Sequence, residues 1–410
     1  MTTDRAVRFL RRVVPGSALV WLEVPLRFLL RAWTRLATVA MTPLARLPGR
    51  LGPPRHVEGD PQRFAEEVGA HLVPRLPGCV LSYPVPPAAA ELNREYVVQS
   101  WFELPPTYVL DVEDGRVCGS DASVIGPGGT FFTDVANRFI PDRTAYPILR
   151  TPVLPPVQKV AGTGAVVATA FDEYYYHWMS EVLPRFAVLG DLLDEADFVV
   201  APASTRFQRE CLARVGVEPH RILEPNRRTQ YQFDRLLVPS LSGVMNHTRP
   251  ESVKYLRQLF GVQSHKGDGG RRIYVSRRGE FRRKVSNEAE VLDVLDKYGF
   301  EAVDPGTITV AEQAVLFAEA SIVVGPHGGG LTNVVFCAPG TVVVELLSPL
   351  GQTLCFWTLT NTAGLRYEPL FGRRTPGLAA TDRRAVQWRD IDVDCGELVR
   401  HLDRLLDKTA

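Results

Sequence analysis

The sequence predicts an α/β protein of two domains built on doubly wound parallel sheets, with a small β-rich part in the N-terminal half. Its 410 residues exceed the roughly 250 that one hydrophobic core usually serves, which favours two domains. From residue 160 onward, short apolar runs alternate with segments of helical periodicity, as in the βαβ units of a parallel sheet. Short turn-flanked strands between residues 96 and 140 supply the β-rich part.

Composition and charge narrow the classes of protein that fit. The chain is 45% hydrophobic and 23% charged, as ordinary soluble globular proteins are. A net charge of +1 argues against a globally basic nucleic-acid binder, so we expect no nucleic-acid partner. The six cysteines are scattered without a CxxC pair, which leaves a zinc ribbon or redox motif unsupported and suits a reducing compartment. We therefore expect a cytoplasmic protein.

Residues 1–54 form a basic amphipathic N-terminal segment in which arginines alternate with Trp, Phe and Leu. Glu23, Arg27 and two prolines interrupt the stretch from Val13 to Leu30, whereas a spanning helix needs about 20 mostly apolar residues. A helix lying in the membrane interface fits the pattern and would make the protein peripheral at the inner face of the membrane. A helix packed on the protein's own surface, or a disordered tail, fits it equally. Pro and Gly at 48–54 indicate a linker.

The next domain is expected over residues 55–248. Asp114-Gly115 predicts the turn of a β-hairpin whose strands are 108–112 and 116–118, and a second turn is predicted at 126–129. Strands and helices then alternate, which predicts a parallel sheet. The expected strands are 165–170, 198–201 and 236–239, and the expected helices are 176–189 and 207–215.

Residues 249–350 predict a second doubly wound sheet with strands at 272–276, 300–303, 321–324 and 341–347. Helices are expected to begin at Asn287 and Thr309, each with a capping box completed three residues later by Glu290 and Glu312. A tight loop at 326–330 leads into a short helix at 331–337. Residues 351–410 are expected to be an extension that packs back on the domains.

Three features follow strands of this second sheet and are therefore expected at its carboxyl edge, where α/β sheets bind ligands. They are the arginines after Ser276 (Arg277 and Arg282), the loop His327, Gly328, Gly329 and Gly330, and Glu345 late in its strand. Glycine amides and a helix N-terminus suit phosphate, arginines pair with a diphosphate, and a carboxylate accepts from ribose hydroxyls. His327 and Asn333 either fix the loop or touch the ligand.

Taken singly, each feature has an ordinary explanation. A glycine run is often a turn, a basic loop is usually a solvated surface, and a lone strand glutamate is often exposed. Their coincidence at one sheet edge favours a nucleoside-diphosphate site.

The same residues carry a resemblance to glycosyltransferase family 61, which covers about residues 160 to 350. The motifs occur in the expected order, and one departure is Gly329, where the family usually has alanine. The resembling motifs are Tyr176-His177-Trp178, Glu181, Leu183-Pro184-Arg185, 273–277, Asn287-Glu288, Glu312-Gln313, 325–333, Phe336 and 344–346.

This resemblance implies a GT-B-like fold, with two facing Rossmann-like domains, an acceptor-side domain at 55–248 and a nucleotide-sugar-binding domain at 249–350. It also implies inverting hexosyl or pentosyl transfer from a nucleotide-diphosphate sugar to a glycan or lipid-linked glycan, in surface or capsular polysaccharide synthesis. A catalytically inactive scaffold in a polysaccharide assembly complex is the alternative function.

For the chemistry, His177 is the expected base, because its pKa lies near neutrality. Glu181, four residues on, shares its helix face and would orient it or contact the acceptor. Glu181 as the base, or His177 merely packed beside Trp178, are the alternatives. Arg277 and Arg282, with the amides of residues 327–330, would stabilise the departing phosphates.

We expect no metal and no cofactor. The run Asp390, Asp392 and Asp394 resembles a metal site, but Ile391 and Val393 alternate with it, which favours an amphipathic strand. An esterase is excluded because no G-x-S-x-G accompanies the loop at 327–330. A dinucleotide oxidoreductase or a P-loop protein is disfavoured because neither complete glycine motif occurs.

Overall fold

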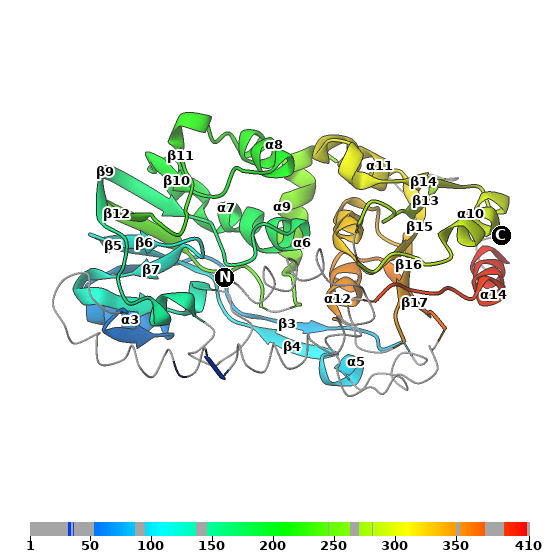
Figure 1. The fold of residues 1–410 in the computed structure, drawn as a ribbon, viewed down its shortest axis with the longest axis horizontal. Helices are drawn as coiled ribbons and strands as arrows, with labels where there is room; N and C mark the ends of the chain where they lie inside the picture. The colour runs from blue at the N-terminus through cyan, green and yellow to red at the C-terminus, as the bar shows by residue number, and fades with distance from the viewer. Residues whose placement is uncertain are drawn as a thin grey trace. The chain divides into compact units, whose positions relative to one another are not determined.

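A computed structural model describes most of the chain and divides it into two compact units (Figure 1). Unit 1 draws on residues 1–72, 110–166 and 225–238, and unit 2 on 73–109, 167–224 and 239–410. Each unit thus combines several chain segments, whereas the predicted boundaries at 54, 248 and 350 are simple cuts. The described residues are 32–33, 36, 53–86, 95–136, 146–244, 246–262, 270–280, 282–349, 353–373 and 389–407.

The predicted N-terminal segment 1–54 lies almost wholly outside the described residues, so its two interpretations stay predictions. Within the described ranges, no helix has the length and apolar character needed to cross a membrane.

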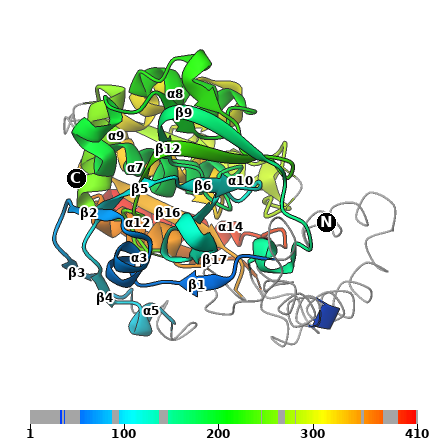
Figure 2. The ribbon, with the colours of Figure 1, turned by 90° about the vertical axis from the view of Figure 1, so that its left-hand side faces the viewer.

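Unit 1 is built on a large mixed sheet, in which β12 pairs parallel with β9 and antiparallel with β6 (Figure 2). Beyond β6, strands β7 and β8 continue antiparallel, and β1 pairs parallel with β8. Helix α3 lies beside β1 and β8. The elements are β1 (His56–Glu58), α3 (Pro61–Val68), β2 (His71–Pro74), β5 (Tyr108–Glu113), β6 (Arg116–Cys118), β7 (Ser123–Ile125), β8 (Thr130–Phe132), β9 (Val157–Val166) and β12 (Gln230–Pro239).

This mixed sheet corrects the prediction that the strands alternating with helices before residue 248 form a parallel sheet apart from the small β-rich part. The parallel pairs expected from the βαβ pattern are present, as β9 with β12 and, in unit 2, β10 with β11. The short strands β6, β7 and β8 follow one another through tight turns, including the predicted turn at 126–129, and such connections produce antiparallel pairs.

The predicted hairpin of 108–112 with 116–118 is wrong. Strands β5 and β6 form as expected, but both pair with β12 instead of with each other. At the Asp114-Gly115 turn the chain stays against β12, where the Asp114 amide donates to Asp234 and the Phe233 amide donates to Gly115. A Cβ on Gly115 would lie 2.7 Å from Leu236 Cβ, so the glycine permits this close approach rather than a hairpin reversal.

Unit 2 contains a five-stranded parallel sheet and the helices around it. Its elements up to residue 260 are β3 (Cys79–Ser82), α5 (Glu95–Val98), β4 (Trp101–Leu104), α6 (Tyr175–His177), a π-helical segment (Trp178–Val182), α7 (Leu183–Leu189), β10 (Phe198–Val200), α8 (Arg206–Val215), β11 (Ile222–Leu223) and α9 (Pro250–Phe260). The later ones are β13 (Arg271–Val275), α10 (Glu288–Lys297), β14 (Phe300–Val303), α11 (Val310–Ala318), β15 (Ala320–Pro326), the 3₁₀ segment η10 (Gly329–Phe336), β16 (Val342–Leu347), α12 (Cys355–Thr362), β17 (Arg366–Phe371) and α14 (Cys395–Asp407).

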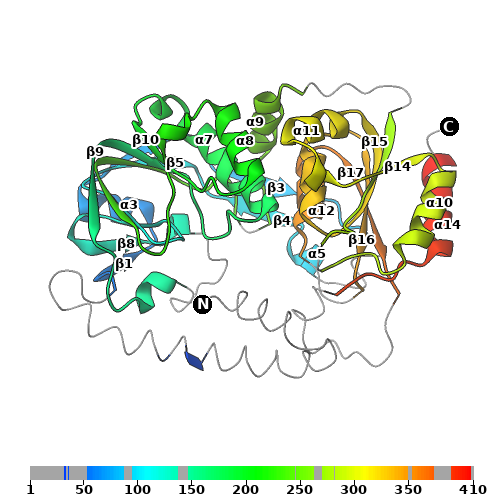
Figure 3. The same cartoon turned by 45° about the horizontal axis from the view of Figure 1, so that its top comes forward.

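The five strands lie in the order β14-β13-β15-β16-β17, all parallel, which confirms the sheet predicted for this half of the chain. Helices α10 and α14 cover one face of it and α11 and α12 the other (Figure 3). Buried residues of α10 and α14, among them Val291, Leu295 and Leu402, join Val324 and Val344 of the strands in one core. In chain order the strands run 2-1-3-4-5, so the order reverses between β13 and β15.

The two predicted helix caps behave differently. Thr309 opens α11 with the complete capping box to Glu312, as predicted. Asn287 precedes α10 but makes no cap, because its amide pairs with the backbone N–H and C=O of Val393 at 3.0 and 2.9 Å. That segment shows the predicted alternation, with Ile391 and Val393 buried. Asn287 therefore fastens the C-terminal segment instead of the helix start.

The predicted helix at 176–189 is present but irregular. It starts as α6, continues as the π-helical segment and ends as α7. Arg185 in α7 is fully buried, and its guanidinium donates to the carbonyls of Val167, Ala168 and Pro239. The arginine thereby satisfies the backbone beyond the strand ends and fixes the helix there.

Candidate functional site

The residues predicted at the sheet edge do meet in unit 2. Register pairs Gly325 of β15 with Glu345 of β16, and β13 ends at Val275 on the other side of β15. The loops after β13 and β15 therefore leave the sheet side by side at the point where the strand order reverses. Open α/β sheets bind their ligands at this kind of point.

His327 and Glu345 form a buried pair. The His327 Nδ1 atom lies 2.5 Å from Glu345 Oε1, and its Nε2 lies 2.9 Å from the Thr353 hydroxyl. Glu345 Oε2 accepts a hydrogen bond from the Tyr367 hydroxyl at 2.5 Å, and the glutamate side chain is only 1% exposed. Both carboxylate oxygens thus have partners inside the fold. The geometry gives Glu345 the role of supporting His327, and its contact with a ribose stays a prediction.

The charge state of His327 follows from its surroundings. Burial lowers its pKa, Glu345 opposes this, and Arg283 and Arg277 add to the lowering. A neutral ring beside a carboxylate carries its proton on Nδ1, so Nδ1 donates to Glu345 and Nε2 accepts from Thr353.

The glycines at positions 328 and 330 of the loop are each required by a different close contact. A Cβ on Gly328 would lie 1.9 Å from Nη1 of Arg277, so this glycine makes room for the guanidinium. A Cβ on Gly330 would lie 2.9 Å from Val275 Cγ1, so Gly330 lets the loop approach the end of β13. At Gly329 the nearest atom would be 3.7 Å away, so an alanine fits there.

Arg277 lies over the glycine loop with few partners of its own. Its side chain is 10% exposed and its buried Nε has no hydrogen-bond partner. Nη2 donates to the backbone carbonyl of Arg282 at 3.3 Å and lies 3.7 Å from Glu280 Oε2. Burial lowers the pKa of Arg277. Arg282 thus takes part in this contact through its backbone carbonyl.

Arg283 belongs to the same cluster, although the sequence analysis did not select it. Its buried Nε has no partner, and within the described residues its side chain makes no hydrogen bond or ion pair. Burial, together with the neighbouring charges of Arg277 and Arg282, lowers its pKa to about 10. The sequence shows that it is basic but not that it is buried. Two poorly compensated guanidinium groups beside a glycine loop make a site for an anion.

Asn333 fixes the loop. It is fully buried, its Oδ1 accepts from the Tyr175 hydroxyl at 2.7 Å, and its Nδ2 donates to Gln313 Oε1 at 2.6 Å and to the Gly330 carbonyl at 3.2 Å. These bonds fit the loop-fixing role, and contact of Asn333 with a ligand stays a prediction. Tyr175 and Gln313 are further site residues that the sequence analysis did not assign a role.

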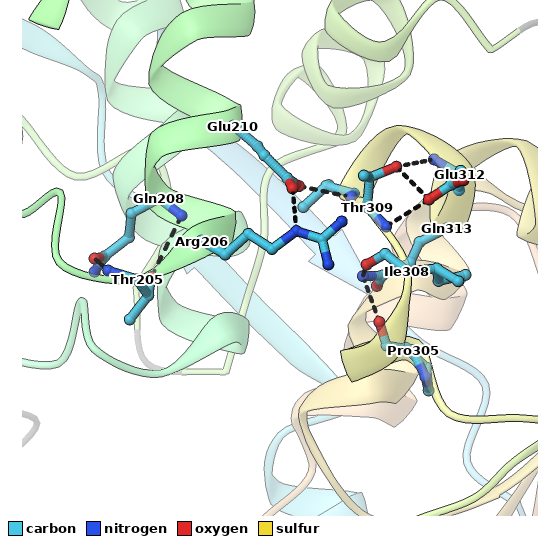
Figure 4. Close-up of polar contacts among 10 residues, drawn as sticks. Thr205, Arg206, Gln208, Glu210, Pro305, Ile308, Thr309, Glu312 and Gln313 are labelled. Carbon is cyan, nitrogen blue, oxygen red and sulfur yellow. Dashed lines mark hydrogen bonds and ion pairs between the residues drawn. The ribbon is translucent and has the colours of Figure 1, made fainter.

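Helix α11 holds Gln313 in a well-fixed frame (Figure 4). Gln313 Nε2 donates to the carbonyls of Pro305 and Ile308. At the helix start, Glu210 of α8 accepts from the Val310 amide at 2.9 Å and is itself paired with Arg206. A carboxylate at a helix N-terminus is stabilising, so α8 helps to fix the start of α11.

His177 and Glu181 form the second predicted group. Nδ1 of His177 lies 2.7 Å from Glu181 Oε1, with the side chains 21% and 8% exposed. Glu181 lies within the π-helical segment and His177 directly precedes it, and such segments are frequent at functional sites. The rings in contact with His177 are those of Phe171, Tyr174 and Tyr176, while Trp178 is fully buried.

Two contacts join this helix to the glycine loop. Tyr175 bonds to Asn333, and the next residue, Tyr176, packs edge-on against Phe356, whose ring also meets that of His327. The structure therefore brings the His177–Glu181 pair, the loop and the arginines into one neighbourhood of unit 2.

Comparison with known proteins points to a sugar-transferring family. Residues 175–344 match the model of the family described as Glycosyltransferase 61. Similar curated proteins are the "Beta-1,2-xylosyltransferase RCN11" of Oryza sativa subsp. japonica (29% identical over 100 residues, 22% of this chain and 19% of the relative) and the "EGF domain-specific O-linked N-acetylglucosamine transferase" of Drosophila melanogaster (32% over 97 residues, 23% and 18%). The "Beta-1,2-xylosyltransferase" of Arabidopsis thaliana is 28% identical over 105 residues, which are 22% of this chain and 20% of the relative. The matches thus span about a fifth of the length of these relatives.

Proposed function

We propose that this protein is a glycosyltransferase that moves a sugar from a nucleoside-diphosphate donor to a hydroxyl acceptor with inversion, because residues 175–344 match the model of the glycosyltransferase 61 family. The observation that carries the proposal is the pair of poorly compensated guanidinium groups, Arg277 beside Gly328 and Arg283 near Arg277 and His327. A diphosphate supplies the charge and the acceptor oxygens that these groups lack within the fold. The relatives' names include xylosyl and N-acetylglucosamine transfer, so sugars of these two classes are the first donors to test.

The proposed reaction is a single displacement at the anomeric carbon. The acceptor oxygen bonds to that carbon as the bond from carbon to the diphosphate oxygen breaks, and the electron pair leaves with the diphosphate. His177 takes the acceptor proton on Nε2, because its Nδ1 faces the Glu181 carboxylate, which orients the ring. Arg277, Arg283 and the amides of the glycine loop stabilise the leaving diphosphate. Glu181 as the base is the alternative assignment.

We extend the proposal to architecture and setting. The five-stranded parallel sheet with helices on both faces supports a Rossmann-like donor half of a GT-B arrangement. A glycan or lipid-linked glycan is the proposed acceptor, in surface or capsular polysaccharide synthesis. All six cysteines are free, which supports a cytoplasmic location, with peripheral attachment at the inner face of the membrane through the N-terminal segment.

The test is a thermal-shift screen of nucleoside diphosphates and of their xylose and N-acetylglucosamine conjugates, followed by a donor-hydrolysis assay. Selective stabilisation by one diphosphate that Arg277→Ala abolishes, together with measurable hydrolysis of its sugar conjugate, supports the proposal. Stabilisation without any hydrolysis or transfer would favour the inactive scaffold. A folded protein that none of these compounds stabilises would overturn the donor site itself.

A further inference from the structure

The Tyr175 hydroxyl forms a direct polar link between the helix that carries His177 and the glycine loop. Tyr175 is the first residue of α6 and His177 the last, so the two are separated by a single residue. The hydroxyl donates to Asn333 Oδ1 at 2.7 Å, and the amide nitrogen of Asn333 donates to the carbonyl of Gly330 within the loop. One side chain thus connects the proposed base to the proposed phosphate site.

The link is anchored at both ends. The Tyr175 ring meets the ring of Phe207 edge-on, with centroids 5.3 Å apart. At the other end, Asn333 is held by Gln313, which donates in turn to the carbonyls of Pro305 and Ile308 (Figure 4). Every group in this series of hydrogen bonds is buried or partly buried, so water cannot readily replace a lost partner.

Resting on the proposed function, we propose that Tyr175 is a positioning residue for sugar transfer, whose hydroxyl fixes the His177–Glu181 pair at the working distance from the donor held by the glycine loop. The hydroxyl does not touch donor or acceptor in this scheme. Its removal leaves Arg277, Arg283 and the loop amides in place, so the donor still binds. It also leaves the Asn333 oxygen without this donor, and the α6 start is then free to shift against the loop. A misplacement of about 1 Å between reacting groups costs on the order of a hundredfold in rate.

The experiment compares Tyr175→Phe with wild type in two measurements. The first is kcat for hydrolysis of the best substrate among the UDP and GDP conjugates of xylose and N-acetylglucosamine, with water in place of the acceptor. The second is Kd of the matching nucleoside diphosphate by calorimetry. We expect kcat to fall about ten- to a hundredfold, Kd to change less than about threefold, and the pH profile of kcat to keep its shape.

Tyr298→Phe is the matched control. Its hydroxyl also donates at 2.7 Å, to Asp403, but it lies at the end of α10 on the opposite face of the sheet. This variant keeps wild-type kcat. The inference is overturned if Tyr175→Phe keeps wild-type kcat, or if its kcat, Kd and melting temperature decline together as in a general loss of structure. A wild-type protein without hydrolysis or transfer would instead overturn the proposed function, so the two failures are distinguishable.

Discussion

Replacing Gly328 by alanine is the sharpest test of where the diphosphate binds. The new Cβ would lie 1.9 Å from Nη1, 2.4 Å from Cζ and 2.8 Å from Nε of Arg277. Carbon and nitrogen atoms in contact stay roughly 3.5 Å apart, so the guanidinium must move by more than about 1 Å. The atoms that move are the end of a flexible side chain, so the fold should survive while the guanidinium loses its place.

The expected loss can be estimated from the contacts at stake. A hydrogen bond to a charged group contributes about 1.5 to 3 kcal/mol, and about 1.4 kcal/mol is a tenfold change in affinity. If one such bond from Arg277 to the diphosphate is lost, Kd should rise about ten- to a hundredfold. Titration calorimetry with the nucleoside diphosphate measures this, and the melting temperature reports whether the fold is intact.

Gly329→Ala is the control, because its Cβ would meet nothing closer than 3.7 Å. This neighbouring variant should bind the diphosphate as wild type does. If Gly328→Ala binds equally well, Arg277 does not hold the phosphates from the position seen here. If both variants weaken binding alike, the loop backbone and not the guanidinium is responsible.

Three further predictions address other groups. Arg283→Met should stabilise the ligand-free protein by about 1 kcal/mol, because it removes a buried charge without a partner, yet weaken diphosphate binding about tenfold; a lower melting temperature would contradict this. His177→Ala should lower the rate of donor hydrolysis at least about a hundredfold with Kd of the diphosphate unchanged, and near-wild-type turnover would exclude it as the base. Burial lowers the pKa of His247 from 6.5 to about 4, so the unfolded state binds a proton at a higher pH than the folded state does. The free energy of unfolding should therefore fall as pH drops from 6.5 towards 4. His247→Gln should reduce this dependence of the melting temperature on pH, and an unchanged dependence would point to other groups.

The second sheet could be predicted because its signals are local and repeated. Apolar runs, the Thr309–Glu312 capping box and the turn glycines each specify a short segment, and a parallel sheet with crossover helices then brings the strand ends to one edge. Arg277, the glycine loop and Glu345 follow from that topology alone. That these residues lie together at the sheet edge could therefore be predicted without knowing any individual side-chain contact.

What the sequence did not reveal depends on long-range pairing. Asn287 is a residue type that commonly caps helices, but its side-chain amide donates instead to the carbonyl of Val393, 106 residues away. The Asp114-Gly115 turn looks like a hairpin because nothing nearby indicates that β12 takes both strands. Arg282 and Arg283 are indistinguishable in a basic run, since only the fold determines that the Arg283 Nε atom is buried without a hydrogen-bond partner.

The two remaining hydrogen bonds of the His327–Glu345 pair have a practical consequence. They come from Thr353 and Tyr367, both of which lie beyond residue 344, where the match to the family model ends. That end also falls inside β16, and β17 completes the sheet after it. A shortened protein that keeps only the family segment would lose Glu345 itself and the support of His327. Expression of this site in isolation therefore requires the chain at least through β17. Comparisons restricted to the family segment overlook Glu345, Thr353 and Tyr367, which hold the histidine in place.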